Sequence, residues 1–369
     1  MFLSLLLLPQ AALCKPRWSE LDTYGWSAYK EDFGKEYGVT EEALRRVIFE
    51  ERLADIIAFN KGAALYKKGV NAMTDMTDAE RQMRLGRSSD IRNQHVLCRS
   101  SMSDEQVFVR GKKEEKVGFV DWREKEGVIS AVKDQGSCGS CWAFASTESV
   151  ESYVSLATGE SVVLSPQQLV SCATNPYSCG GVGGCEGSIP ELAFNYVQLY
   201  GQSLESSTPY LGVDQNCSSN YSPAVQIDGY KKLNMNDADD IIKALMTIGP
   251  LAVNVDASIW HDYDSGILDD CRLSDGTLDL NHVVQLVGYG YDTELSANYW
   301  IIRNSWASTF GEDGYIRLLK ANDTDEEACY DDFFPLDGTG CNGGPPVQHV
   351  CGTCGVLFDA SYPIGARLL

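Results

Sequence analysis

Cysteine and histidine are the residues of this sequence best suited to nucleophilic chemistry, and thirteen cysteines accompany only four histidines. Cys141 follows a run rich in glycine and serine, 135–140, and lies at the start of a segment, 139–158, whose pattern predicts a helix closed by Gly159. A helix N-terminus stabilises a thiolate, because unpaired backbone N–H groups and the helix dipole both favour negative charge. We therefore predict that Cys141 is a nucleophile.

One histidine is placed to act as its base. His282 opens the apolar run 282–291, which is typical of a buried strand, and the mouth of a strand can hold an imidazole rigidly. On its own this pattern also fits a hydrogen-bonded core histidine. His95 lies in a charged stretch, His261 in a polar, turn-like stretch, and His349 in a loop rich in glycine and cysteine.

Two amides could complete such a site. Asn304 follows the strand-like run 299–303, and its side-chain oxygen could orient the imidazole of His282. The side-chain amide of Gln135, together with backbone N–H groups at Cys141, could receive the oxyanion of a tetrahedral intermediate.

The elements that must position these residues change in character along the chain. Residues 18–84 are dense in charge, and apolar residues on one face predict a helix over 41–61: Ala43, Val47, Leu53, Ile56, Ile57 and Phe59. Segment 86–116 has no clear period and reads as a linker. In 139–158 the predicted apolar stripe is Ala145, Val150, Val154 and Ala157. After about residue 226, short runs such as 251–255 and 299–303 predict strands, so we expect an α+β fold with a cleft between a helical and a β half.

Bulk properties limit the compartment and the partners. Residues 1–14 carry no charge and include the apolar run 2–8, too short to span a bilayer, so we predict a signal peptide. A disordered or buried N-terminal strand is the alternative. Thirteen cysteines outside the cytosol imply disulfides, and a net charge of −22 argues against nucleic acid as a partner. No later segment is long and apolar enough to suggest a membrane anchor.

Three ordered blocks resemble the signature of the papain family of cysteine proteases. They are Gln135 through Cys138 and Cys141 to Trp142, the Asn281–His282 strand, and Asn304-Ser305-Trp306. The resemblance implies a two-lobed fold, with a helical lobe beside a β-barrel-like lobe. It implies that Gln135 serves the oxyanion hole, Cys141 is the nucleophile, His282 the base and acid, and Asn304 the orienting residue, with Trp306 shielding the Asn304–His282 bond. Ala307 and Phe310 replace the glycine and tryptophan usual after this block.

The preceding segment is similar to the inhibitory propeptides of cathepsin L-like proteases. Helix positions that match are Glu41, Arg45, Phe49, Ile56 and Asn60, while Arg52 replaces the usual asparagine. A second motif covers 69–75, with Met73 where phenylalanine is usual. An exposed amphipathic helix is the plainer interpretation. The resemblance implies a zymogen whose propeptide runs backwards through the cleft until acid loosens it, and these divisions: signal peptide 1–14, propeptide and linker 15–116, peptidase domain 117–369, helical lobe 117–226, β lobe 227–369, insertion 321–350.

Cysteine arithmetic agrees with one free thiol. Cleavage near residue 117 would remove Cys14 and Cys98 and leave eleven cysteines, which fits five bridges and one nucleophile. Similarity implies the pairs Cys138–Cys185, Cys172–Cys217 and Cys271–Cys354, and leaves open the pairing of Cys179, Cys329, Cys341 and Cys351, three of which flank or lie in the insertion. A disulfide clamp is the first interpretation of that long segment. The two Cys-x-x-Cys pairs, 138–141 and 351–354, also match redox or zinc half-motifs, but those need a reducing compartment, and we predict no metal and no cofactor.

The resemblance also implies a substrate cleft. Gly187 and Ser188 would bind the peptide backbone, Asn281 and Trp306 would border the cleft, and the main selectivity pocket would be walled by Ile189, Pro190, Asn254, Leu280, Val283 and Asp359. We expect apolar residues to be accepted there and, if the Asp359 carboxylate faces the pocket rather than solvent, arginine as well.

We therefore expect a cysteine endopeptidase made as a zymogen, acting on protein or peptide substrates through a thioester; no adjacent pair of histidines suggests a blocking loop. The competing hypothesis is a catalytically silent homologue that binds or inhibits. We expect a monomer of the lysosome, vacuole or exterior, with cystatin-like inhibitors as candidate partners. Asn216, Asn220 and Asn322 begin N-glycosylation patterns.

Overall fold

The computed structural model describes residues 15–86, 118–322 and 327–369. The predicted signal peptide, residues 87–116 of the predicted linker, and His95 lie outside these ranges. No helix within them is both long and apolar enough to cross a bilayer. The helices are α1 Trp26–Asp32, α2 Val39–Asn60, α3 Asp78–Gln82, α4 Cys141–Thr158, α5 Pro166–Cys172, α6 Pro190–Tyr200 and α7 Ala238–Thr247.

A mixed sheet forms the other half of the molecule, with order β1-β6-β9-β8-β7-β5-β12-β4 and β2 paired with β7. Two small sheets pair β10 with β11 and β3 with β13. The strands are β1 Tyr66–Lys68, β2 Val120–Asp121, β3 Val225–Gln226, β4 Gly229–Lys232, β5 Leu251–Val255, β6 Tyr263–Leu268, β7 His282–Asp292, β8 Ala297–Arg303, β9 Tyr315–Lys320, β10 Cys329–Asp332, β11 Gln348–Cys351, β12 Ala360–Ile364 and β13 Arg367–Leu368.

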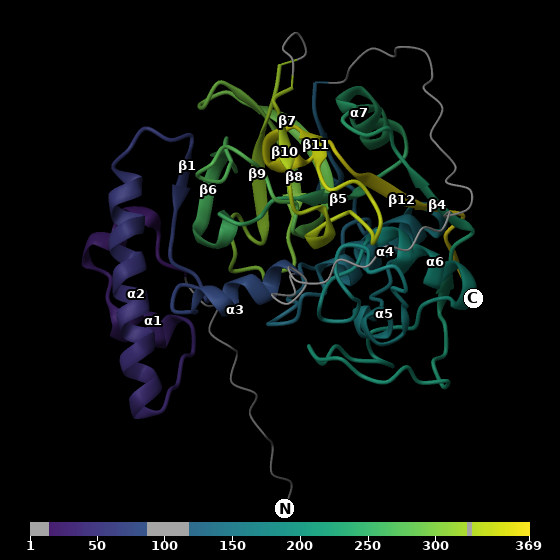
Figure 1. The fold of residues 1–369 in the computed structure, drawn as a ribbon, viewed down its shortest axis with the longest axis horizontal. Coiled ribbons are helices and arrows are strands. Elements are labelled where there is room, and N and C mark those ends of the chain that lie inside the picture. The colour runs from purple at the N-terminus through teal and green to yellow at the C-terminus, as the bar shows by residue number, and fades with distance from the viewer. Residues whose placement is uncertain (1–14, 87–117, 323–326) are drawn as a thin grey trace, which may run out of the picture.

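The N-terminal segment builds a small core of its own and then joins the sheet. Phe49, Leu53 and Ile56 of α2 pack against aromatic residues of the first turns, including Trp26 and Tyr29. The predicted face was partly wrong, because Ala43 and Val47 lie in the first turns of α2 and are exposed. β1 pairs antiparallel with β6 at the sheet edge, so this segment is attached by backbone hydrogen bonds as well as by side chains. In Figure 1 α1 and α2 lie to one side of the sheet, and α3 leads from them toward α4.

α4 is the central helix and lies between the sheet and the smaller helices (Figure 1). It ends at Gly159, whose φ of 79° suits a left-handed cap. The predicted apolar stripe was too narrow, because every residue from Cys141 to Ser155 is buried, whereas Ala157 is exposed. A buried carboxylate on the helix is paired across to the sheet: Glu148 lies 3.3 Å from the Arg303 guanidinium of β8. A helix packed on two sides buries residues that a single-face pattern assigns to solvent.

Five disulfides cross-link the described residues. The three pairs implied by similarity are present: Cys138–Cys185, Cys172–Cys217 and Cys271–Cys354. The cysteines left open pair as Cys179–Cys341 and Cys329–Cys351. Both Cys-x-x-Cys pairs therefore have at least one member in a disulfide with a distant partner, which excludes a zinc half-site. Cys141 is the free cysteine of the described ranges.

Candidate active site

The nucleophile predicted from the sequence stands at the start of the central helix. Cys141 is the first residue of α4, after Ser140 at the N-cap, and it is only 2% exposed. The backbone N–H groups of Val283, Trp142 and Cys141 itself are hydrogen-bond donors to its sulfur. Because Val283 follows His282, this contact brings the helix-borne sulfur to the beginning of β7. The two elements meet as the sequence pattern predicts.

The imidazole is held by the predicted amide. His282 opens β7, and its Nε2 lies 2.8 Å from the Oδ1 of Asn304, just beyond β8. The same Oδ1 accepts the backbone N–H of Ser305 at 2.8 Å, which fixes the amide orientation. The Trp306 ring lies 4.9 Å from the imidazole, centroid to centroid, and both residues are buried. The arrangement fixes which ring nitrogen faces Asn304 and excludes water from that bond.

With the propeptide in place, the thiol of Cys141 and the imidazole of His282 are both neutral. Burial raises the pKa of the Cys141 thiol to about 11, against a lowering effect of the three backbone N–H groups. Burial lowers the pKa of His282 to about 4, and the Asn304 hydrogen bond opposes that only in part. The sequence pattern predicts a thiolate at this position. The structure differs because the propeptide covers the sulfur and removes it from water.

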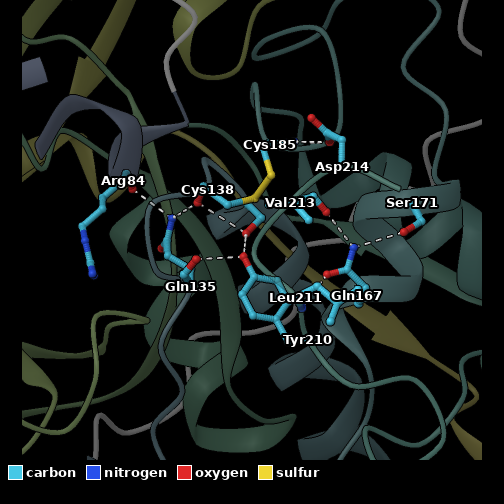
Figure 2. Close-up of a disulfide and its surroundings, with 12 residues drawn as sticks. Arg84, Gln135, Cys138, Gln167, Ser171, Cys185, Tyr210, Leu211, Val213 and Asp214 are labelled. Carbon is cyan, nitrogen blue, oxygen red and sulfur yellow. Dashed lines mark hydrogen bonds between the residues drawn. A yellow bond between two sulfur atoms is a disulfide. The ribbon is translucent and has the colours of Figure 1, made fainter. Parts of the chain in front are cut away.

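The cover is the described end of the propeptide. A Cβ placed on Gly86 would lie 3.4 Å from the Cys141 sulfur, so the Gly86 backbone sits directly against it, with a φ of 68°. Two residues earlier, the carbonyl of Arg84 accepts a hydrogen bond of 3.0 Å from the Gln135 side chain (Figure 2). Gln135 is held in turn by Ser305, whose hydroxyl donates to its Oε1 at 2.6 Å. The donor predicted to bind an oxyanion is therefore occupied by a propeptide carbonyl.

A second group of propeptide contacts was missed by the sequence reasoning. Arg81 pairs with Asp262 at 2.6 Å, and its carbonyl lies 3.1 Å from the Nε2 of His261. The His261 ring stacks on Trp306 at 4.8 Å, so it adjoins the site instead of lying in an exposed turn. Asn71 donates to the carbonyl of His261 at 2.6 Å. The adjacent Trp260, His261 and Asp262 were the only sequence signal available.

The predicted backbone-binding residues lie next to the nucleophile. Gly187 has a φ of 87° and touches Gly86, and a Cβ there would lie 2.2 Å from the Gly86 carbonyl. This close approach requires glycine. Ser188 follows and is buried. The side chain of Asn281 is hydrogen-bonded within the β lobe: its Oδ1 accepts from the backbone N–H of Ala257, and its Nδ2 donates to the hydroxyl of Ser258.

The residues predicted to wall the selectivity pocket are buried, and the acid among them has a partner. Ile189 caps α6 and Pro190 is its first residue, while Leu280 and Val283 flank His282 in the chain. Asp359 is 3% exposed, which rules out a solvent-facing carboxylate. It lies 3.1 Å from Lys232 of β4 and 3.3 Å from the amide of Asn254. Lys232 also pairs with Glu191 at 3.0 Å.

Comparisons with known proteins agree with this geometry. Residues 118–332 match the family described as "Papain family cysteine protease", and residues 26–80 match the "Cathepsin propeptide inhibitor domain (I29)". The chain belongs to the papain family of cysteine proteases. It is 34% identical to Cathepsin L-like proteinase of Phaedon cochleariae, over 92% of this chain and 93% of that protein. It is 36% identical to Cathepsin S of Mus musculus, over 81% and 86%.

A solved structure extends the likeness to the fold. Digestive procathepsin L 3 of the Tenebrio molitor larval midgut aligns with a TM-score of 0.69 and 30% identity, over 95% of this chain and all of that one. The predicted papain-like α+β fold and its helical propeptide are confirmed. This member of the family is a cysteine peptidase made as a zymogen, with its own propeptide as intramolecular inhibitor and peptides as substrates.

Proposed function

We propose that Cys141, His282 and Asn304 form the catalytic triad of this peptidase, with Gln135 and the Cys141 backbone N–H as its oxyanion hole. One observation carries the proposal: a free cysteine at the start of α4 lies beside the strand whose first residue, His282, is bonded to Asn304 at 2.8 Å. Nucleophile, base and orienting group are the parts that acyl transfer by a thiol requires.

The chemistry follows once the propeptide leaves. Water reaches the cleft, the proton of Cys141 moves to His282, and the resulting ion pair is stabilised by the helix N-terminus and by the Asn304 oxygen. The thiolate attacks the scissile carbonyl, and Gln135 donates to the oxyanion in place of its bond to Arg84. His282 then protonates the leaving amine, a thioester remains, and a water deprotonated by His282 hydrolyses it. The proposed steps need no cofactor.

Acid favours release of the propeptide by two groups at its contact. Burial lowers the pKa of His261 to about 3 while the propeptide is docked. Once the propeptide has left and water reaches His261, its pKa returns toward the ordinary value of about 6.5, so below that pH protonation of His261 favours the released state. The pKa of Asp262 is also lowered, since the Arg81 ion pair outweighs its burial. A group of that kind stabilises docking above its ordinary pKa and loses the stabilisation as pH falls.

A small thiol-reactive epoxide tests the triad against the silent homologue. After acid treatment, we expect stoichiometric labelling of Cys141, located by peptide mapping, together with loss of hydrolysis of a Phe-Arg reporter peptide. A folded, acid-processed protein that takes up no label at Cys141, or that hydrolyses the reporter after complete labelling, would contradict the proposal.

We further propose that the selectivity pocket accepts apolar residues and disfavours arginine. Leu280, Ile189 and Val283 supply apolar walls, and the Asp359 carboxylate is paired with Lys232. Although burial opposes its charge, two carboxylates hold the pKa of Lys232 well above its ordinary value. An incoming guanidinium would therefore meet a fixed cation beside the acid.

The paired change Lys232→Met with Glu191→Gln should reverse that preference. It removes the cation and one carboxylate together, so the Asp359 charge becomes available without an excess of buried acid. We expect the ratio of kcat/KM for Arg-Arg over Phe-Arg reporters to rise at least about tenfold, the effect of one charge-assisted hydrogen bond. Lys231→Met on the same strand is the control. A wild-type enzyme that already cleaves both reporters equally would refute the pairing argument.

The disulfides limit the cellular compartments in which the protein can fold. Five disulfides indicate an oxidising environment such as the secretory pathway, and relatives include Procathepsin L of Mus musculus. We propose a lysosomal, vacuolar or extracellular site of action, for which the exposed Asn216 and Asn220 are candidate glycosylation positions.

A further inference from the structure

The insertion reaches across the molecule and is bonded to the opposite lobe. β10 and β11 lie side by side (Figure 1) and are joined by Cys329–Cys351, and the turn between them contains a segment, Pro335–Asn342, that we name the strap. The strap is bonded to the helical lobe by Cys179–Cys341. Two backbone hydrogen bonds of 2.9 Å flank that bridge, from Gly180 to the Gly340 carbonyl and from Asn342 to the Tyr177 carbonyl. The match to the family ends at residue 332, just before the strap begins.

The strap touches one wall of the selectivity pocket directly and reaches the other through Gly180. Gly338 packs so closely on the β-lobe wall that a Cβ there would lie 2.1 Å from the Leu280 carbonyl. On the other side, a Cβ on Gly180 would lie 2.1 Å from the Gly338 carbonyl and 3.0 Å from the Ile189 side chain. Gly180 also approaches Gly187, whose Cβ position is 2.3 Å from the Gly180 carbonyl. An unbroken series of contacts therefore runs from Gly187, beside the nucleophile, through the strap to the opposite wall.

The strap is rigid as well as close. The N–H groups of Gly338, Thr339 and Gly340 all donate to the Pro335 carbonyl, which closes a tight turn. Gly338 and Gly340 are buried, and the foot of the strap is fixed where the buried Asp332 accepts the backbone N–H of Phe334 at 2.7 Å. The Cys179–Cys341 bridge joins positions 162 residues apart, so the strap cannot swing away while that bond is intact.

We propose that the strap ends the substrate cleft at the selectivity pocket, on the side that holds residues N-terminal to the scissile bond. An extended peptide that continues beyond the pocket must pass between Leu280 and Ile189, where the strap lies. The substrate class is then peptides with a short segment before the scissile bond. The inference rests on the proposed function of the same cleft and names its substrates more narrowly.

A length series of reporters tests it on the processed full-length enzyme. Acetyl-Phe-Arg amide is compared with the same reporter extended by two alanines at its amino end, with active enzyme counted by iodoacetamide titration of Cys141. We expect the extension to lower kcat/KM at least about tenfold. Cys179→Ser with Cys341→Ser should restore the longer reporter to within about twofold of the shorter one. Cys172→Ser with Cys217→Ser, a bridge inside the helical lobe, should leave the wild-type ratio unchanged.

Wild-type rates that are equal on both reporters, or a ratio that the Cys179/Cys341 change does not move, would overturn the proposal. The wild-type series decides by itself if the double variant fails to fold. Hydrolysis of the short reporter that is lost on iodoacetamide treatment leaves the catalytic assignment standing in either case, so the two proposals fail separately.

Discussion

Replacing Cys141 with serine should reduce turnover of a Phe-Arg reporter by about 10⁴-fold or more, the scale seen when a nucleophile of a catalytic unit is removed. A serine hydroxyl does not ionise near neutral pH, so the ion pair with His282 cannot form. The neutral hydroxyl is also a much weaker nucleophile than the thiolate. The thermal midpoint should change little, because serine nearly reproduces the shape of cysteine at this buried helix start.

The experiment needs two controls. Because the variant cannot process itself, its propeptide is removed by a trace of wild-type enzyme. That enzyme is then inactivated, and its remaining turnover of the reporter is subtracted. Ser149→Ala, on the same helix, removes a hydroxyl that donates to the Ala145 carbonyl at 2.8 Å, and this variant should keep its activity. Residual turnover of about one per cent or more in Cys141→Ser would show that another group is the nucleophile.

The candidate site could be predicted from the sequence because each of its parts depends on a local pattern. A free cysteine at a helix start, a histidine at a strand mouth and an asparagine after the next strand each need only a few neighbours to be recognised. The strand bounds followed from runs of apolar residues: 251–255 was predicted and found as β5, and 282–291 became His282–Asp292. These features depend on backbone periodicity, which a short window contains.

Features that depend on distant contacts were missed. Arg81 and Asp262 are 181 residues apart, and neither has a pattern that names the other. The pairing of Asp359 with Lys232 and that of Cys179 with Cys341 could not follow from spacing. The burial of α4 was predicted wrongly for a different reason. Its local pattern indicated one apolar stripe, but the helix packs on two sides and buries residues outside that stripe. Ala307, which stands where glycine is usual, has a φ of 66°, in the left-handed region that favours glycine.

Alkylation of Cys141 should be at least about a hundredfold faster in the processed enzyme than in the zymogen near pH 6. In the zymogen the thiol pKa is about 11, so the thiolate fraction near pH 6 is about 10⁻⁵. Pairing with a protonated His282 lowers such a pKa to about 3–4, which makes the thiolate dominant. The lower basicity costs about 10³ in intrinsic nucleophilicity, so the net gain from ionisation is about 10², before loss of the Gly86 cover adds to it.

The pH dependence of the alkylation rate of Cys141 should differ between the zymogen and the processed enzyme. In the zymogen, whose thiol pKa is raised, the iodoacetamide rate should climb with pH throughout the neutral range, because each unit of pH increases the small thiolate fraction about tenfold. In the processed enzyme the rate should be flat above about pH 5, where the thiolate is already formed. Peptide mapping separates Cys141 from Cys98 of the linker, and Arg81→Ala, which removes the Asp262 pair, should give an intermediate zymogen rate. A zymogen profile as flat and fast as that of the processed enzyme would mean that the propeptide does not suppress ionisation of Cys141.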